Sequence, residues 1–162
     1  MPPMAVLLGC ALVFDFLNGF HDSSNIVATV IFSRALSPRK ALLLAAVAEC
    51  SGPFLFGVAV ANTVGSKVVR PGAVTIAAVL AAIISAIIWD LLTWLLGLPS
   101  SSSHALIGGI LGAVLLDFGP DVIRYDGLLK VLVALFISPL LGLVVSYLLM
   151  KVILFLGQWF SP

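Results

Sequence analysis

The chain has 162 residues, of which 62% are hydrophobic and only 9% are charged, and its net charge is +1. Soluble globular domains carry about 25% charged residues, so this composition excludes an ordinary water-soluble domain and predicts an integral membrane protein in contact with lipid. The nearly balanced charge also argues against nucleic acid as a partner.

Five hydrophobic segments predict an all-α membrane fold, with residues 1–162 forming a single transmembrane domain. In chain order they cover residues 4–32, 41–61, 73–98, 105–118 and 128–156. A helix needs about 20 apolar residues to span a bilayer, so the second, third and fifth segments are long enough. The first segment is too long for one straight span and has a polar interruption, which predicts a broken helix. The fourth is short and predicts a half-helix.

The basic residues between these segments do not define an orientation in the membrane. If all five segments cross, four basic residues lie on each side: Arg34, Arg39, Lys40 and Lys151 on one, and Lys67, Arg70, Arg124 and Lys130 on the other. The rule that cytoplasmic loops are the more basic ones then favours neither orientation. Either other features orient the chain, or the unit works in both orientations.

The polar interruption of the first segment, residues 18–25, reads NGFHDSSN. A central aspartate costs about 2.5 to 3.5 kcal/mol on membrane-insertion scales, so Asp22 is expected to be functional or paired. We expect unwound backbone here, whose carbonyl oxygens would join Asp22 and Asn25 in a shell for a hard cation. His21, Ser23 and Ser24 are candidate accessory residues. The alternative is a loop outside the membrane in which Asp22 caps a helix.

The second interruption is a run of four serines, Ser100 to Ser103, followed by His104 and an apolar, glycine-containing segment. A serine before a helix caps free N–H groups, and a helix start carries a partial positive charge. Such a run can bind an oxyanion without lysine or arginine. The alternative is a surface turn, where serine is common, but a turn does not need four serines.

Two further acidic residues lie within hydrophobic segments. Asp90 would add a cation ligand or a proton-titrating group if it faced the site, and otherwise it would cap a bend or face the lipid headgroups. Glu49, which precedes Gly52 and Pro53, is a candidate proton site or pairs with a polar group on another helix. Both are candidate coupling or structural acids.

The two polar patterns resemble the signatures of the inorganic phosphate transporter family, the sodium- or proton-coupled phosphate permeases. Residues 19–29, GFHDSSNIVAT, resemble the first signature, and residues 98–109, LPSSSSHALIGG, resemble the second. The resemblance extends over nearly the whole chain. It implies a secondary transporter with inverted repeats and no organic cofactor, not an enzyme. It also implies that Asp22 and Asn25 coordinate a cation and that Ser101, Ser102 and Ser103 bind phosphate, with Ser100 and His104 beside them.

The chain departs from this family in two respects. Family members carry two copies of each signature, whereas this chain has one of each and equals about one repeat. A complete site would then need a second half-transporter or an antiparallel copy of the same chain. Relatives also commonly have asparagine where this chain has Asp90.

The resulting expectation is symport of inorganic phosphate with Na⁺, or with H⁺ as the rival ion, across a cell membrane (inner or plasma). Three alternatives remain. One is a non-transporting assembly half of a larger permease, and another is a transporter of sulfate. The third is an intramembrane serine hydrolase, which is disfavoured because the adjacent Ser103 and His104 would diverge by about 100° on a helix.

Overall fold

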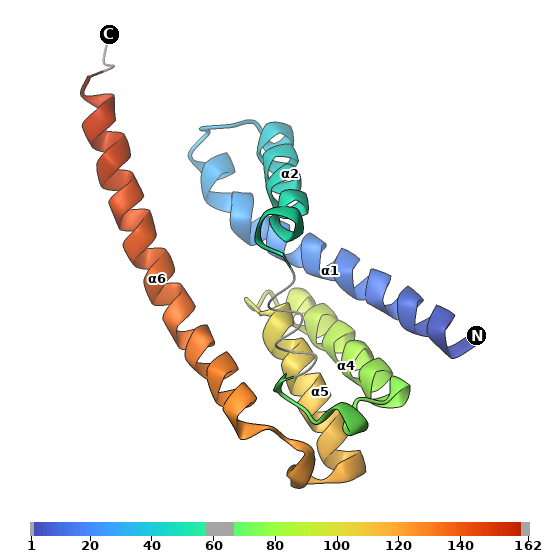
Figure 1. The fold of residues 1–162 in the computed structure, drawn as a ribbon. Coiled ribbons are helices and arrows are strands. Elements are labelled where there is room, and N and C mark those ends of the chain that lie inside the picture. Colours follow the sequence, from blue (N-terminus) through green and yellow to red (C-terminus); the bar gives the residue numbers. More distant parts are fainter. Residues whose placement is uncertain (1, 58–66, 160–162) are drawn as a thin grey trace.

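Helices form nearly all of the structure that the computed structural model describes, residues 2–57 and 67–159 (Figure 1). The helices are α1 (Pro2–Phe32), α2 (Pro38–Phe56), α4 (Ile76–Leu95), α5 (Ser102–Phe118) and α6 (Tyr125–Gly157), with short 3₁₀ turns η1 (Pro71–Ala73) and η2 (Pro120–Val122). Each predicted segment corresponds to one helix, so the all-α prediction is confirmed. The end of the second predicted segment, residues 58–61, lies outside the described residues.

Three of the described helices are long and apolar enough to cross a membrane: α1 from Pro3 onward, α4 and α6. Helix α5 has 17 residues, in agreement with the predicted half-helix. Helix α2 is not among the three, but the predicted second segment, residues 41–61, extends beyond the described residues, so its expected span stays a prediction. The 19 residues of α2 include the charged side chains of Arg39, Lys40 and Glu49.

The first helix bends but does not unwind. Its helical assignment is continuous from Pro2 to Phe32, so the expectation of unwound backbone in residues 18–25 is wrong. Figure 1 shows that the darker and lighter blue parts of α1 run in different directions. The hydroxyls of Ser23 and Ser24 donate to the carbonyl oxygens of Phe20 and His21, at 3.1 and 2.8 Å. Serine hydroxyls that bond back to the preceding turn often bend helices, so these two bonds are consistent with a bent α1.

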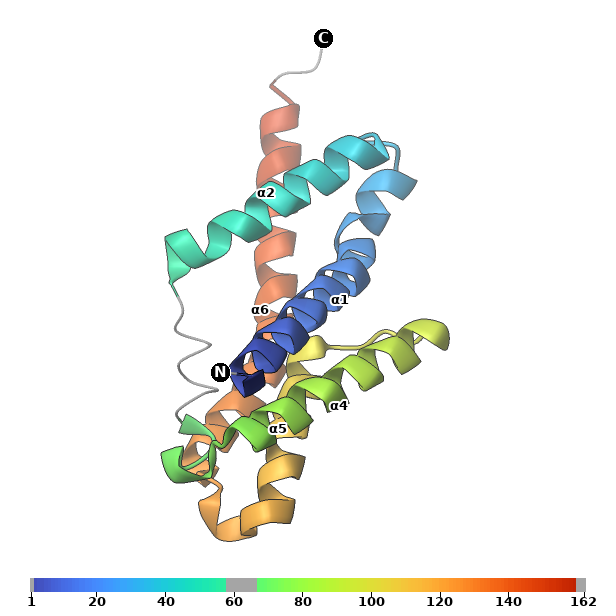
Figure 2. The same ribbon diagram turned by 90° about the vertical axis from the view of Figure 1, so that its right-hand side faces the viewer.

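Helices α4 and α5 pack closely because small residues face each other. A Cβ atom on Gly109 of α5 would lie 2.7 Å from the carbonyl oxygen of Ala82 on α4. Helix α1 lies across α4, where Phe14, Ile83 and Ala86 form a buried cluster. Figures 1 and 2 both show α1, α4 and α5 beside one another. These three helices carry the predicted site residues, except Glu49 on α2 and Ser100 and Ser101 just before α5.

A second buried cluster closes the end of the molecule at which η1 and η2 meet. The two connections are paired by backbone hydrogen bonds from Arg70 N–H to Val122 O and from Arg124 N–H to Val68 O, both at 2.9 Å. The cluster beside them consists of Val68, Val69, Ala73, Ala78 and Val114. This pairing fixes the start of α4 relative to the end of α5.

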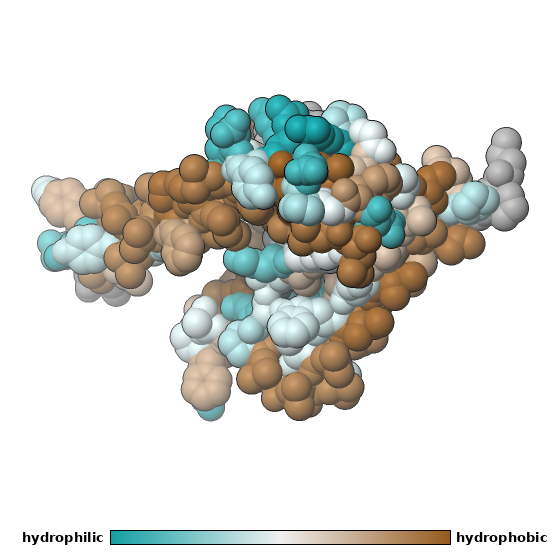
Figure 3. Space-filling model, turned by 90° about the horizontal axis from the view of Figure 1, so that it is seen from below, coloured by the Kyte–Doolittle hydropathy of each residue, from teal (hydrophilic) through white to brown (hydrophobic). Residues whose placement is uncertain are grey.

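The outer surface is largely apolar. Helix α6 runs along one side of the molecule (Figure 1), and almost none of its surface is buried by the rest of the chain. Large side chains such as Phe32, Phe54 and Leu116 are about nine-tenths exposed, at 93%, 90% and 89%. Figure 3 shows broad hydrophobic surface from below, with the largest group of hydrophilic residues at the top of the view and smaller groups elsewhere. Surface of this kind must be covered by lipid or by other helices.

Candidate functional site

The serine run forms the start of helix α5, as predicted. Ser101 is the N-cap residue, and its hydroxyl oxygen accepts a hydrogen bond from the His104 backbone N–H at 3.4 Å. The hydroxyl oxygen of Ser100 accepts a hydrogen bond from the indole N–H of Trp89 on α4 at 3.0 Å. Ser101, Ser103 and His104 are exposed. The serine run therefore surrounds the N-terminus of α5 with hydroxyl groups. A helix N-terminus of this kind can bind an anion.

Ser102 connects this helix start to α1. Its side chain is only 9% exposed, and its hydroxyl donates a hydrogen bond to Asn18 Oδ1 at 2.5 Å. The serine run and the polar part of α1 therefore lie together, although they are far apart in the sequence.

The polar residues of α1 share one side of the helix. Because α1 is continuous, Asn18, Asp22 and Asn25 follow each other at i, i+4 and i+7 and lie on one face. Asn18 lies against Ser102, so this face is turned toward the start of α5. Asp22 is half-buried and Asn25 is exposed. The two candidate cation ligands therefore lie on the side of α1 that meets the serine run.

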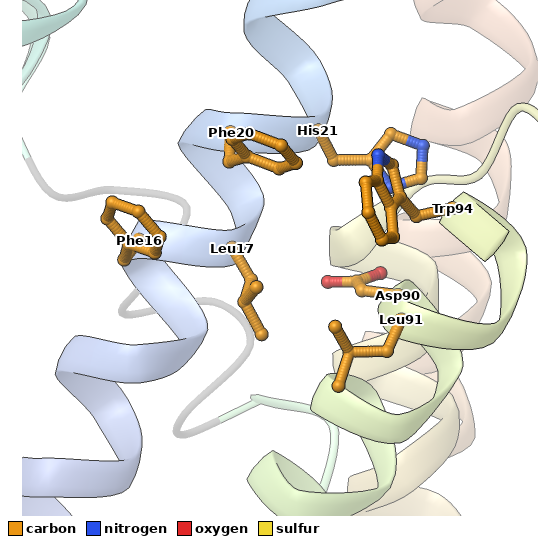
Figure 4. A pocket seen from close by; sticks show the side chains of 7 residues that line it. All are labelled: Phe16, Leu17, Phe20, His21, Asp90, Leu91 and Trp94. Atoms are coloured by element: carbon orange, nitrogen blue, oxygen red, sulfur yellow. The ribbon is translucent and has the colours of Figure 1, made fainter.

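Asp90 lies on α4 at a cavity between α1 and α4 (Figure 4). The cavity has a volume of about 180 Å³ and is lined by Phe16, Leu17, Phe20, His21, Asp90, Leu91 and Trp94. The Asp90 side chain is 3% exposed, and neither carboxylate oxygen has a hydrogen-bond partner among the described residues. The structure therefore brings His21 and Asp90 to one cavity.

A second, wider groove of about 560 Å³ is lined by residues of both α4 and α5. Ser85 and Trp89 line it from α4, and His104, Gly108 and Gly112 are among the residues that line it from α5. His104 therefore lines this groove and is not among the residues that line the Asp90 cavity.

Glu49 is not brought to either of these places. It is exposed on α2 and lines neither described cavity. Ser23 and Ser24 bond to the backbone of their own helix, so their hydroxyl protons are already engaged.

Asn18 is a site residue whose contact the sequence did not reveal. In the sequence, Asn18 marked only the start of the polar interruption. Residues 18–25 were expected to be unwound, so the spacing of a helix was not applied to them. The position of Asn18 four residues before Asp22 would have placed it on the same face if residues 18–25 had been interpreted as helix.

Comparisons with known proteins identify relatives of this chain. A probable low-affinity inorganic phosphate transporter of Rhizobium meliloti is 43% identical over 152 residues, which cover 94% of this chain and 46% of the relative. One of Bacillus subtilis with the same description is 44% identical over 149 residues, covering 89% of this chain and 44% of the relative. This chain thus spans a little under half the length of these relatives.

A solved structure of a sodium-dependent phosphate transporter superimposes with a TM-score of 0.85 at 28% identity, over 94% of this chain and 39% of that chain. Residues 18–160 match the phosphate transporter family, and this match includes both the polar face of α1 and the serine run. The relatives are transporters and not enzymes, which agrees with the expectation that this protein is not an enzyme. The chain is an integral membrane protein that belongs to the phosphate transporter family.

Proposed function

We propose that the chain forms one half of a transporter that carries inorganic phosphate across the cell membrane together with Na⁺. The observation that carries this proposal is the hydrogen bond between Ser102 and Asn18, because it joins the serine run to the helix face that bears Asp22 and Asn25. An anion site and a cation site then lie side by side. Membership of the phosphate transporter family and likeness to a sodium-dependent phosphate transporter support the choice of both ions.

Phosphate is held at the start of α5 in this proposal. Ser101 and Ser103 are exposed there, and the helix N-terminus adds backbone N–H donors and partial positive charge. The Ser102 hydroxyl donates its proton to Asn18 in the structure. Ser102 can therefore donate to phosphate only if its hydrogen bond to Asn18 breaks. Ser100 and His104 lie beside these residues and complete the polar rim.

Cation coupling follows from the charge of phosphate. Moving each unit charge against a membrane potential of 100 mV costs about 2.3 kcal/mol. The entry of a divalent phosphate alone into a negative interior would therefore cost about 4.6 kcal/mol. Two monovalent cations cancel this cost, and a third makes uptake electrically favourable. Asp22 and Asn25 present carboxylate and amide oxygens for such a cation, the ligand type that hard cations prefer. Protons are the rival coupling ion.

The second half of the transporter is another half-chain or an antiparallel copy of this one. The relatives are roughly twice as long as this chain, and the site residues Asn25, Ser101, Ser103 and His104 are exposed within it. The small residues of the groove between α4 and α5 allow another helix to approach closely. Movement of one half against the other would expose the site to each side of the membrane in turn.

Uptake of radiolabelled phosphate by proteoliposomes with an inward Na⁺ gradient tests the proposal. The double variant Ser101→Ala/Ser102→Ala should lose uptake while remaining folded. Ser33→Ala is the matched control, because that hydroxyl bonds only to the backbone of its own helix, at Val30 O. Unchanged uptake by the double variant would refute the phosphate site. If the chain transports only after a second half-chain is added, the antiparallel-copy arrangement is excluded.

A further inference from the structure

Trp89 on α4 makes a contact with the serine run that the sequence did not reveal. Its indole N–H donates a hydrogen bond to the hydroxyl oxygen of Ser100 at 3.0 Å, across 11 positions of sequence. The ring nitrogen of tryptophan can only donate, so the Ser100 hydroxyl is the acceptor in this pair. Ser100 is therefore tied to α4, although it lies just before the start of α5.

The connection between α4 and α5 folds back, so that Ser100 returns to Trp89. Gly97 has a φ of +64°, a left-handed conformation that glycine adopts without a steric penalty. The backbone N–H groups of Gly97 and Leu98 bond to carbonyl oxygens in the last turn of α4, at 3.1 and 2.8 Å. These two bonds form the Schellman pattern that ends helices. Figure 2 shows the connection running back along α4, where the bond from Trp89 holds it one residue before Ser101, the N-cap of α5.

The bond from Trp89 leaves the hydroxyl proton of Ser100 free. A serine hydroxyl has one proton to donate and two lone pairs that accept. In Ser100 the indole engages a lone pair, and the proton has no acceptor among the described residues. Ser102 is the opposite case, because its proton is engaged by Asn18. Ser101 also accepts through its oxygen, but by a longer bond of 3.4 Å within its own helix. Ser100 thus combines a firmly held oxygen with a free proton, and accepting one bond polarises the O–H group for donation.

This pair of residues lies at the end of the α4–α5 groove that is nearest the serine run. Trp89 lines the groove together with His104, the third residue of α5. The Trp89 side chain is 54% exposed. An exposed hydrogen bond competes with bonds to water and adds little to the stability of a fold. The bond from Trp89 to Ser100 therefore has its main consequence in the orientation of the hydroxyl.

We propose that Trp89 is a positioning residue of the phosphate site, which holds the Ser100 hydroxyl so that its proton is donated to phosphate. This inference rests on the proposed function, in which the anion at the start of α5 is phosphate. Trp89 acts through Ser100, because the only proton on its ring nitrogen is used in the bond to that residue. A hydroxyl that is already oriented loses less freedom when phosphate binds than one that rotates freely. Loss of the indole N–H should therefore weaken phosphate binding and leave the maximal transport rate nearly unchanged.

Uptake of radiolabelled phosphate into proteoliposomes tests the proposal. It is measured under an inward Na⁺ gradient over a series of phosphate concentrations, with a second half-chain present if uptake requires one. Trp89→Phe keeps an aromatic ring in the groove and removes the N–H. It should raise the KM for phosphate about fivefold, the equivalent of one neutral hydrogen bond, with little change in the maximal rate. Trp159→Phe is the matched control and should keep the KM of the parent, because Trp159 follows α6 and its ring contacts that of Phe155.

A double-mutant cycle separates positioning through Ser100 from a general effect on the fold. Ser100→Ala should raise the KM at least as much as Trp89→Phe, and combining the two substitutions should cause no further rise. Ser100→Thr keeps a hydroxyl and should recover most of the affinity that Ser100→Ala loses. A KM of Trp89→Phe equal to that of the parent would overturn the proposal. A rise in KM that persists in full in the Ser100→Ala background would also overturn it, because Trp89 would then act by another route.

If Trp89→Phe does not fold, β-(3-benzothienyl)alanine at position 89 alone gives the same comparison, because it keeps the shape of the indole and lacks only the N–H. Failure of this inference is distinguishable from failure of the proposed function. Absence of Na⁺-driven phosphate uptake by the parent chain, with or without a second half-chain, would refute the proposed function and the role of Trp89 with it. Uptake that Ser101→Ala/Ser102→Ala loses, together with an unchanged KM when the N–H at position 89 is removed, would refute only the role of Trp89.

Discussion

The hydroxyl of Ser102 at the start of α5 donates a hydrogen bond of 2.5 Å to Asn18 Oδ1 on α1, across 84 positions of sequence. This contact is the direct link between the serine run and the polar face of α1. It also occupies the one hydroxyl proton that Ser102 has. If Ser102 binds phosphate as proposed, it must release Asn18, and the proposed anion site would then be coupled to the position of α1.

The first prediction concerns the strength of this link. Asn18→Ala leaves the buried Ser102 hydroxyl without its acceptor, and should lower the free energy of unfolding by about 1 kcal/mol, as measured for hydrogen bonds between membrane helices. A double-mutant cycle with Ser102→Ala, followed by tryptophan fluorescence during denaturation in detergent, measures the coupling. Strictly additive effects of the two substitutions would show that the bond contributes nothing to stability.

The helices themselves were predictable from the sequence because their apolar runs are long. The predicted segment 105–118 became α5, Ser102–Phe118, and the predicted segment 128–156 became α6, Tyr125–Gly157. In a bilayer the backbone has no hydrogen-bonding alternative to a helix, so such runs leave little choice of structure. The capping role of a serine in the run was predictable for a similar local reason, and Ser101 performs it.

The bend in α1 and the surroundings of Asp90 were not predictable in the same way. The sequence suggested an unwound stretch at residues 18–25, but Ser23 and Ser24 bond to the preceding turn and the helix continues. Whether Asp90 faces lipid or a cavity depends on how α1 crosses α4, a tertiary relationship without a local sequence signal. The contact of Asn18 with Ser102 depends on the same crossing.

The second prediction concerns the cation proposed at Asp22. Asp22→Asn removes the carboxylate but keeps a side chain of the same shape, so stimulation of phosphate uptake by Na⁺ should be lost. Phosphate uptake into proteoliposomes, measured over a series of sodium concentrations, checks this. Asp117→Asn, an exposed acid at the far end of α5, should behave as the parent. A normal sodium response in Asp22→Asn would exclude Asp22 as the coupling ligand.

The third prediction concerns the surface at which the proposed second half would bind. Gly112 lines the open groove between α4 and α5, and a Cβ atom there would contact nothing within 4 Å. Gly112→Leu should leave the fold of the single chain intact but weaken assembly, because a bulky side chain keeps another helix away. The oligomeric state in detergent, from light scattering, measures this. Gly9→Leu, at an equally open position on α1, is the control, and an assembly unaffected by Gly112→Leu would place the partner elsewhere.

The fourth prediction separates two neighbouring glycines of α5. Gly109→Ala would bring its Cβ atom to 2.7 Å from the backbone carbonyl oxygen of Ala82, closer than real Cβ contacts, so α4 and α5 must move apart. Overpacking of this kind costs about 1 to 3 kcal/mol of stability. At Gly108 a Cβ atom meets nothing within 4 Å, so Gly108→Ala should instead stabilise the chain by about 0.5 to 1 kcal/mol through its better helix propensity. Thermal unfolding in detergent compares the two variants. Equal stability changes would mean that α4 and α5 do not approach as closely at Gly109 as the structure shows.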